Sequence, residues 1–111
     1  MSLDGIRPRD QSRWLDVLDD ERGTLRLEFW RGYAFVHTTF RKRIAAMRFG
    51  RRMFPHLKRW LKAVGHEFVY VYIPEGDEML HRFQKYFGFV DVHKDGQPLR
   101  VNGHIFMAQR C

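Results

Sequence analysis

The sequence predicts an α/β fold with a mixed, twisted sheet and helices on both of its faces. Three observations support this prediction: segments within 25–40 alternate apolar and polar residues, a helical apolar stripe runs through 44–64, and the segment EFVYVYI at 67–73 is almost continuously apolar. A strand that is apolar on both sides is normally covered on both sides. We therefore expect 67–73 at the centre of a partly parallel sheet.

The length and composition of the chain predict one folded domain, residues 1–111. A chain of 111 residues can bury a single hydrophobic core, and 44% hydrophobic residues is typical of a folded protein. No apolar run approaches the roughly 20 residues that span a bilayer, and residues 1–10 lack the apolar stretch of a signal peptide. The single cysteine, Cys111, excludes an internal disulfide. We expect a cytoplasmic protein without a membrane partner.

The N-terminal region is expected to contain a short extended segment at 5–8 and then a helix at 10–18. A polar residue at the start of the helix, Asp10 or Ser12, can cap it. The large apolar residues are spaced i, i+1, i+4 and would share one helical face: Trp14, Leu15 and Leu18.

A β-hairpin is expected next. Residues 25–30 have the period of a strand with one buried face, since Leu25, Leu27 and Phe29 alternate with more polar neighbours. The dipeptide Arg31-Gly32 suits a tight turn, and 33–40 returns as a strand rich in aromatic and β-branched residues.

Residues 44–64 are expected to form a long amphipathic helix. Its apolar stripe repeats at i, i+4, i+7, i+8 and i+11 and consists of Met53, Leu57, Trp60, Leu61 and Val64. Six cations fall largely on the other side: Arg48, Arg51, Arg52, Lys58, Arg59 and Lys62. Pro55 lies inside the pattern, so it either kinks one helix or begins a second one.

The C-terminal region predicts another helix and two further strands. Asp77 can cap a helix that runs to Phe87 and ends at Gly88. Strands are expected at 89–94 and 104–109, which gives the element order β-α-β-β-α-β-α-β-β. The residues that we expect to be buried against the sheet are Met53, Leu57, Trp60, Leu61, Phe83 and Phe87.

The formal net charge of +7 favours polyanionic partners, among them nucleic acid. The basic side of the 44–64 helix is the main signal, but helical spacing alone predicts a solvated face there, and no aromatic stacking platform lies beside it. The six histidines include no i, i+4 pair and no cysteine partner, so we expect no metal site. The two serines do not fit a strand–turn–helix nucleophile elbow.

The segment VYVYIPEGDEMLHRFQKYFGFVDV at 69–92 resembles the strand–loop–helix–Gly–Phe segment of the GNAT acyltransferases. The stretch IRPRDQSRWLDVL at 6–18 is similar to the start of that family, although a second early helix and a strand are missing. Short GNAT-like domains of tailed phages, including the internal virion protein A type, are similar in length and element order. The resemblance implies a compact GNAT-like fold over the whole chain.

The resemblance also implies an acyl-CoA site. In the family two strands, here 33–39 and 68–73, splay apart, and the pantetheine arm lies between them and bonds to exposed backbone. The pyrophosphate meets the start of the next helix, where free N–H groups and the helix dipole favour an anion. The corresponding cofactor residues here are Phe35, Val36, His37, Thr38, Arg41, Lys42, Arg43, Ile44, Asp77, Phe83 and Gln84.

Two features depart from the family pattern. The phosphate loop of the family contains glycines that let backbone approach the pyrophosphate, whereas this chain has Ala45 and Ala46. The tyrosine that protonates the departing CoA thiolate is replaced by Gln84, and an amide cannot act as a general acid. Candidate catalytic bases are Glu28, His37 and Glu75.

Two classes of function follow as hypotheses. The first is an acetyl-CoA-dependent N-acetyltransferase that acts on a protein or a small amine. The second is a GNAT-derived phage protein without catalysis that binds and modulates a host protein, in the host cytoplasm or in the virion. Nucleic-acid binding is the third. The cluster Arg41-Lys42-Arg43 favours the first hypothesis, and the missing glycines and tyrosine favour the second.

Overall fold

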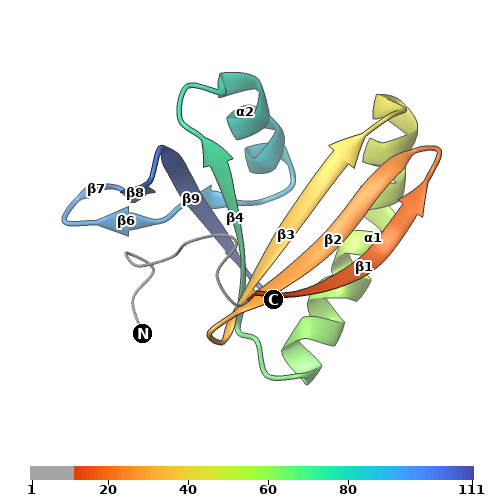
Figure 1. Ribbon diagram of the computed structural model, residues 1–111, viewed down its shortest axis with the longest axis horizontal. Helices are drawn as coiled ribbons and strands as arrows, with labels where there is room; N and C mark the ends of the chain where they lie inside the picture. The colour runs from red at the N-terminus through yellow and green to blue at the C-terminus, as the bar shows by residue number, and fades with distance from the viewer. Residues whose placement is uncertain (1–11) are drawn as a thin grey trace.

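A mixed sheet organises residues 12–111, the part of the chain that the computed structural model describes (Figure 1). Within this part the sheet has seven strands in the order β1-β2-β3-β4-β9-β5, with β8 paired to β9 off this path, and β6 and β7 form a separate pair. The strands are β1 (Arg13–Asp20), β2 (Gly23–Trp30), β3 (Tyr33–Phe40), β4 (Phe68–Pro74), β5 (Val90–Asp91), β6 (His93–Lys94), β7 (Gln97–Pro98), β8 (Arg100–Val101) and β9 (His104–Arg110). The helices are α1 (Arg43–Ala63) and α2 (Glu78–Tyr86).

The predicted hairpin at 25–40 is confirmed as β2 and β3, which pair antiparallel from Gly23↔Phe40 to Trp30↔Tyr33. Arg31 and Gly32 form the connecting turn and have φ angles of 45° and 85°. Two positive φ values suit the two-residue hairpin turn whose twist matches that of the strands.

The helix predicted at 10–18 is wrong, because β1 occupies residues 13–20. It pairs antiparallel with β2, and its register shifts at a bulge between Asp16 and Leu18. Most of β1 is exposed, so its apolar residues are not buried on one side as the predicted helix required. Hydrogen bonding to the open edge of β2 therefore outweighs the local helical spacing. The extended segment predicted at 5–8 and the cap Asp10 lie outside the described residues.

The predicted 44–64 helix is confirmed as the single helix α1, and Pro55 lies inside it without dividing it. Leu57 and Leu61 are buried as expected. Met53 and Trp60 were expected in the core but are 38% and 45% exposed. They lie at the edge of the stripe, beside an apolar groove that Leu15 and Val17 of β1 also line. No helix in residues 12–111 is long and apolar enough to cross a membrane.

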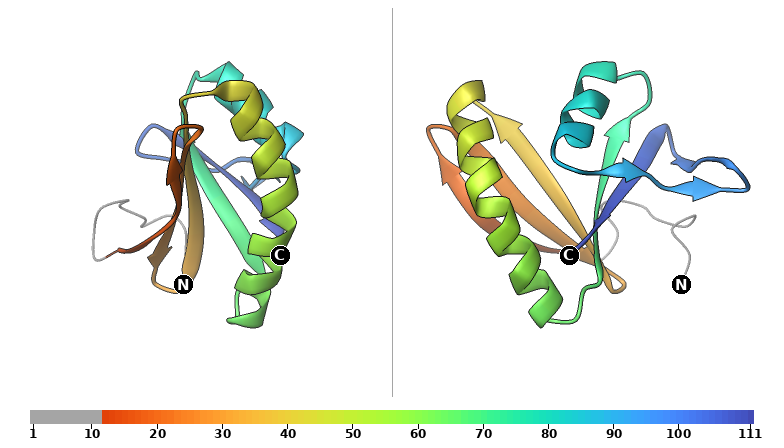
Figure 2. Two further views of the ribbon diagram at one scale, coloured as in Figure 1. Left: turned by 90° about the vertical axis from the view of Figure 1, so that its right-hand side faces the viewer. Right: turned by 180° about the vertical axis from the view of Figure 1, so that it is seen from behind.

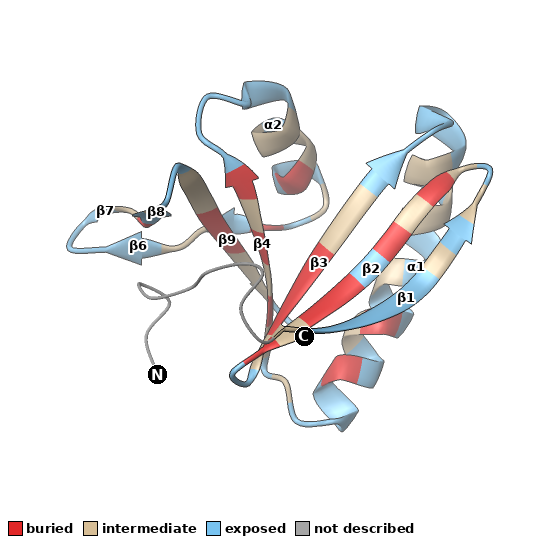
Figure 3. Ribbon diagram, viewed as in Figure 1, coloured by how far each residue is buried: buried red, intermediate tan, exposed pale blue. Residues whose placement is uncertain are grey.

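Both helices lie on the same face of the sheet, so the prediction of helices on both faces is wrong for the described residues (Figure 2). Leu57 and Leu61 of α1 join the same core cluster as Leu80 and Phe87 of α2, which are partly buried. On the other face the described chain places Leu99 against Trp30, Phe35 and Phe106. Val92, Leu99 and Val101 thus supply apolar cover on the side where a helix was expected, while residues 93–97 between them are exposed (Figure 3).

The central position of the 67–73 strand is confirmed, because β4 lies between β3 and β9. It pairs antiparallel with β9 at seven positions, from Phe68↔Arg110 to Pro74↔His104. Its parallel pairing with β3 is limited to Phe35↔Tyr70. Beyond this point β3 and β4 diverge toward their carboxyl ends, which confirms the opening expected between them (Figure 1).

The end of α2 follows its sequence signals. Asp77 caps the helix by accepting a hydrogen bond from the backbone N–H of Leu80 at 3.0 Å, and Gly88 ends it with a φ of 95°. The strand predicted at 89–94 is divided, since β5 pairs with β9 and β6 pairs with β7. The strand predicted at 104–109 is confirmed as β9.

We expect Leu61→Ala to lower the free energy of unfolding by about 2–5 kcal/mol, because it leaves a cavity beneath α1 where Leu61 is fully buried. Met53→Ala on the same helix should change it by roughly 0.5 kcal/mol. Urea denaturation of both variants checks this, and equal losses would contradict the burial difference between the two residues.

Candidate functional site

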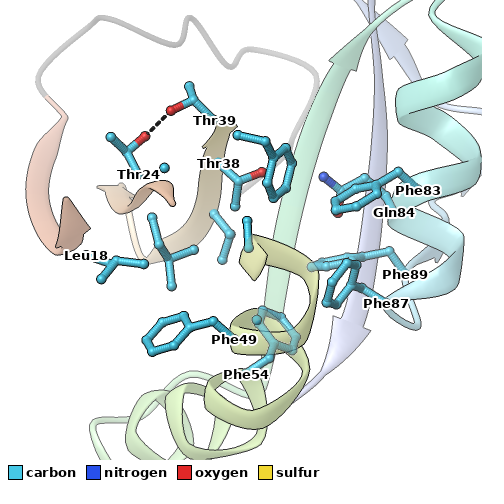
Figure 4. A pocket seen from close by; sticks show the side chains of 16 residues that line it. Leu18, Thr24, Thr38, Thr39, Phe49, Phe54, Phe83, Gln84, Phe87 and Phe89 are labelled. Carbon is cyan, nitrogen blue, oxygen red and sulfur yellow. Dashed lines mark hydrogen bonds between the residues drawn. The ribbon is translucent and has the colours of Figure 1, made fainter. Parts of the chain in front are cut away.

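An apolar cavity of about 60 Å³ lies on the helix side of the sheet, between the end of β3, α1 and α2 (Figure 4). Its lining comes from Leu18 of β1, the start of β2, the end of β3, the first half of α1, and α2 with the residues that follow it. Six phenylalanines line it: Phe40, Phe49, Phe54, Phe83, Phe87 and Phe89. Its only polar side chains within the described residues are three threonines and Gln84. The cavity therefore suits the apolar part of a ligand and offers few polar groups.

Aromatic rings bridge the opening between the two strands. The ring of Phe40, at the end of β3, meets the ring of Phe83 on α2 edge-on, with 4.7 Å between their centroids. Phe83 in turn lies 4.9 Å from Phe87. The cavity has room for only a few water molecules, since about 10–15 Å³ of such volume is needed for one. A longer ligand must therefore displace at least one of these rings.

Gln84 places an amide against this apolar cavity. The residue is only 7% exposed, and its side chain makes no hydrogen bond to the described residues. No fully buried side-chain nitrogen or oxygen in this part of the chain lacks a partner, so the amide of Gln84 keeps access to the cavity space. Figure 4 shows it on the cavity side of α2. Gln84 can thus bond a ligand through both a donor and an acceptor.

A second group of polar side chains lies on the sheet face opposite the helices. Glu28 on β2 is 1% exposed and accepts hydrogen bonds from three side chains. The Ser12 hydroxyl donates to its Oε2 at 2.5 Å, and the Tyr72 hydroxyl donates to its Oε1 at 2.8 Å. His37 Nε2 lies 2.8 Å from the same Oε1. The structure thus brings the candidate bases Glu28 and His37 into one hydrogen-bonded pair.

The charge state of Glu28 follows from this environment. Burial raises the pKa of Glu28, but the hydrogen bonds from His37, Ser12 and Tyr72 outweigh burial, and the net pKa lies below its ordinary value of 4.5. Glu28 is therefore ionised at neutral pH. Because a carboxylate only accepts hydrogen bonds, Nε2 of His37 carries the proton and Nδ1 is left as an acceptor.

His37 can exchange protons with a bound molecule. Its side chain is 27% exposed and its ring lies 4.8 Å from the ring of Trp14. Nδ1 of His37 has no hydrogen bond to residues 12–111. His37 lines an open groove with Trp14 and Arg26, and Thr24 and Thr39 line both this groove and the cavity. The groove and the cavity are thus neighbours at the end of β3.

Glu75, the third candidate base, is not part of this group. It is exposed, and its Oε1 lies 2.8 Å from Nε of Arg100. Asp77, placed by the resemblance at a cofactor position, serves as the cap of α2 and does not line the cavity. Neither residue has a geometry that requires a ligand.

Two of the three cations at the start of α1 already interact with acidic residues of the protein. Arg41 donates to the carbonyl oxygen of Asp20 at 2.6 Å and to Asp19 at 3.2 Å, and Lys42 lies 3.8 Å from Glu21. Arg43 forms no salt bridge to the described residues. The first turn of α1 has no acidic residue and no side-chain cap. Exposed ion pairs contribute little, so an anion can replace them.

The other expected cofactor residues divide between the two sheet faces. Val36, Thr38, Phe83 and Gln84 line the cavity, whereas the side chain of Phe35 packs in the aromatic cluster on the opposite face. Ile44 is 69% exposed. Sequence reasoning missed Ser12, Phe40 and Tyr72. Alternation within 67–73 places Tyr72 on one face of β4, but only the strand order brings it next to Glu28.

Within residues 12–111, no group of three or more His, Cys, Asp and Glu side chains is arranged to hold a metal ion. No protein-family model matches this sequence, and no curated protein matches it.

We expect Glu28→Gln to lower the free energy of unfolding at pH 7 by about 1–3 kcal/mol, because it removes a buried charged acceptor of three hydrogen bonds. The pKa of Glu28 is lowered by folding, so the stability that its charge contributes is present above pH 4.5 and is lost as the pH falls through the folded-state value.

The stability difference between wild type and Glu28→Gln should therefore shrink as the pH falls below 4.5, as measured by urea denaturation. Glu75→Gln, which removes an exposed ion pair, is the matched control and should stay within about 1 kcal/mol of wild type. A Glu28→Gln difference that does not depend on pH would contradict this assignment.

Proposed function

We propose that this chain is a GNAT-like acyl-CoA-binding domain that transfers an acyl group, such as acetyl, to an amine of a protein or a small molecule. The observation that carries the proposal is the parallel pair β3–β4, which separates after Phe35↔Tyr70, together with the cavity beside the end of β3 that the side chain of Gln84 lines. Beyond Phe35, the side of β3 that faces β4 has no strand partner in the described chain. Such backbone can bond the amides of a pantetheine arm.

The start of α1 supports the same ligand. It lies directly after β3; Arg41 and Lys42 precede it, and Arg43 is its first residue. Helix N-termini attract phosphate through their free N–H groups and the helix dipole. An arm between β3 and α2 would therefore leave its pyrophosphate near three cations. Ala45 and Ala46 replace the family glycines, so side chains rather than a backbone cradle would bind the phosphates.

The pair Glu28–His37 supports proton removal from the acceptor amine. Ionised Glu28 orients the imidazole, and Nδ1 of His37 takes a proton from the amine in the groove. The proton leaves as the amine nitrogen attacks the thioester carbonyl carbon, and the C–S bond then breaks to give the amide and the CoA thiolate. Gln84 can donate a hydrogen bond to the carbonyl oxygen but cannot give up a proton. The thiolate takes a proton from water, and protonated His37 returns its proton to the solvent.

The aromatic bridge between Phe40 and Phe83 favours a second candidate function. With these rings in contact the cavity is about 60 Å³, which is too small for a pantetheine arm. If the rings do not separate, the chain is a GNAT-derived binding protein that acts on a partner protein without catalysis. Calorimetry with acetyl-CoA separates the two candidates, since only the first requires binding.

We expect acetyl-CoA to bind wild type, and Arg41→Ala/Arg43→Ala to weaken this binding on the order of a hundredfold. Each substitution removes a charge-assisted phosphate contact worth roughly 1.5–3 kcal/mol. Isothermal titration calorimetry at two salt concentrations measures the change. Arg13→Ala/Arg82→Ala, which removes two exposed cations elsewhere, is the control and should keep its affinity. An absence of heat with wild type would exclude the acyltransferase.

We expect His37→Gln to lower the rate of acetyl transfer to a lysine peptide by about a hundredfold or more, because it removes the general base. Its affinity for acetyl-CoA should not change, since the side chain of His37 lines the groove and not the cavity. The exposed His93 of β6 provides the matched control, His93→Gln. Transfer at the wild-type rate in His37→Gln would rule out this base.

A further inference from the structure

The excess positive charge of the chain is confined to one helix. Seven of the 20 Lys and Arg residues lie on α1, and α1 contains no Asp or Glu. The 13 Lys and Arg residues that remain equal the 13 Asp and Glu residues of the chain in number. The formal charge of +7 therefore equals the charge of α1 alone. A general solvated surface would distribute this charge over several elements.

Three of the arginines form a narrow row on the outer side of α1. Arg48, Arg52 and Arg59 fall within about 40° of one another around the helix, and about 180° from Leu57 and Leu61, which pack on the sheet. With Lys62 the row extends over about 21 Å at 1.5 Å per residue. Figure 2, seen from behind, shows α1 in front of the part of the sheet formed by β1, β2 and β3.

The side chains of this row are not used inside the protein. Arg48, Arg52 and Lys62 make no hydrogen bond or salt bridge to residues 12–111. Arg59 bonds only His56, on the same helix, at 2.9 Å. By contrast, Arg22, Arg26 and Arg110 elsewhere in the chain are each paired with a carboxylate. The row is therefore available to an anionic partner without breaking an internal ion pair.

We infer that the outer side of α1 binds the phosphate backbone of double-stranded nucleic acid, independently of base sequence and of acyl transfer. Duplex DNA carries one charge per about 1.7 Å of axis, so a row of this length faces roughly 12 phosphates. Arginine suits phosphate because its planar fork bonds two oxygens. A membrane surface fits less well, since Leu57 and Leu61 at the centre of the apolar stripe are packed against the sheet and cannot enter the lipid.

The test is fluorescence anisotropy of a labelled 20-base-pair duplex of mixed sequence at several NaCl concentrations between 50 and 200 mM. We expect wild type to bind with an affinity that falls as salt rises. The plot of log affinity against log salt concentration has a slope of about −0.9 per phosphate contact. The variant Arg48→Ala/Arg52→Ala/Arg59→Ala removes three contacts, so its slope should be less steep by about 2.7. At 0.1 M salt this corresponds to a loss on the order of a hundredfold.

Two further variants make the test specific. Arg13→Ala/Arg82→Ala/Lys85→Ala removes the same charge from exposed residues of β1 and α2 and should keep most of the affinity. Arg48→Lys/Arg52→Lys/Arg59→Lys keeps the charge on α1 and should keep most of the salt slope. Circular dichroism establishes that each variant is folded.

Three results would overturn the inference: no binding of wild type at 50 mM NaCl, an equal loss in the control that removes charge elsewhere, or tighter binding to phosphatidylserine vesicles or polyglutamate than to the duplex.

Discussion

β3 and β4 meet at a single point, and the two halves of the sheet are arranged around this contact. The strands are parallel, so they need a long crossover, and α1 supplies it. They pair only at Phe35↔Tyr70, and this divides the sheet into β1–β3 under α1 and β4–β9–β5 under α2. On the helix side, phenylalanine rings fill the space between the two halves. On the other side, the hydrogen bond from Tyr72 to Glu28 joins the halves across β3.

The two buried polar residues, Glu28 and Gln84, differ in a way that bears on function. The carboxylate of Glu28 accepts hydrogen bonds from three protein side chains. These bonds keep it charged and fix the orientation of the His37 imidazole. Gln84 has no such partners and faces an apolar space. A satisfied buried charge positions its neighbours, whereas an amide that borders open space can bond a ligand without breaking a hydrogen bond to the protein. The first arrangement suits proton transfer and the second suits binding.

Local signals determined most of the fold that could be predicted. The hairpin, α1, the central strand and the capped helix α2 all follow from periodicity, Asp77 and Gly88. The failure at β1 has a nonlocal cause, because the open edge of β2 supplies bonds that no local pattern shows. A stripe such as Leu57–Leu61 tells which side of a helix is apolar but not which sheet face it covers. Likewise, Glu28 and His37 were identified singly, and only the β2–β3 register brings them together.

The bulge in β1 has a consequence for self-association. Within the described chain β1 has a partner on one side only, and Leu15 and Val17 are exposed on it. A regular exposed edge strand with apolar side chains is a template on which other chains can add strands and form aggregates. The register shift between Asp16 and Leu18 interrupts that template, and Asp16 and Asp19 add charge to it. A foreign strand could then follow β1 for only a few residues, which would protect the folded protein at high concentration.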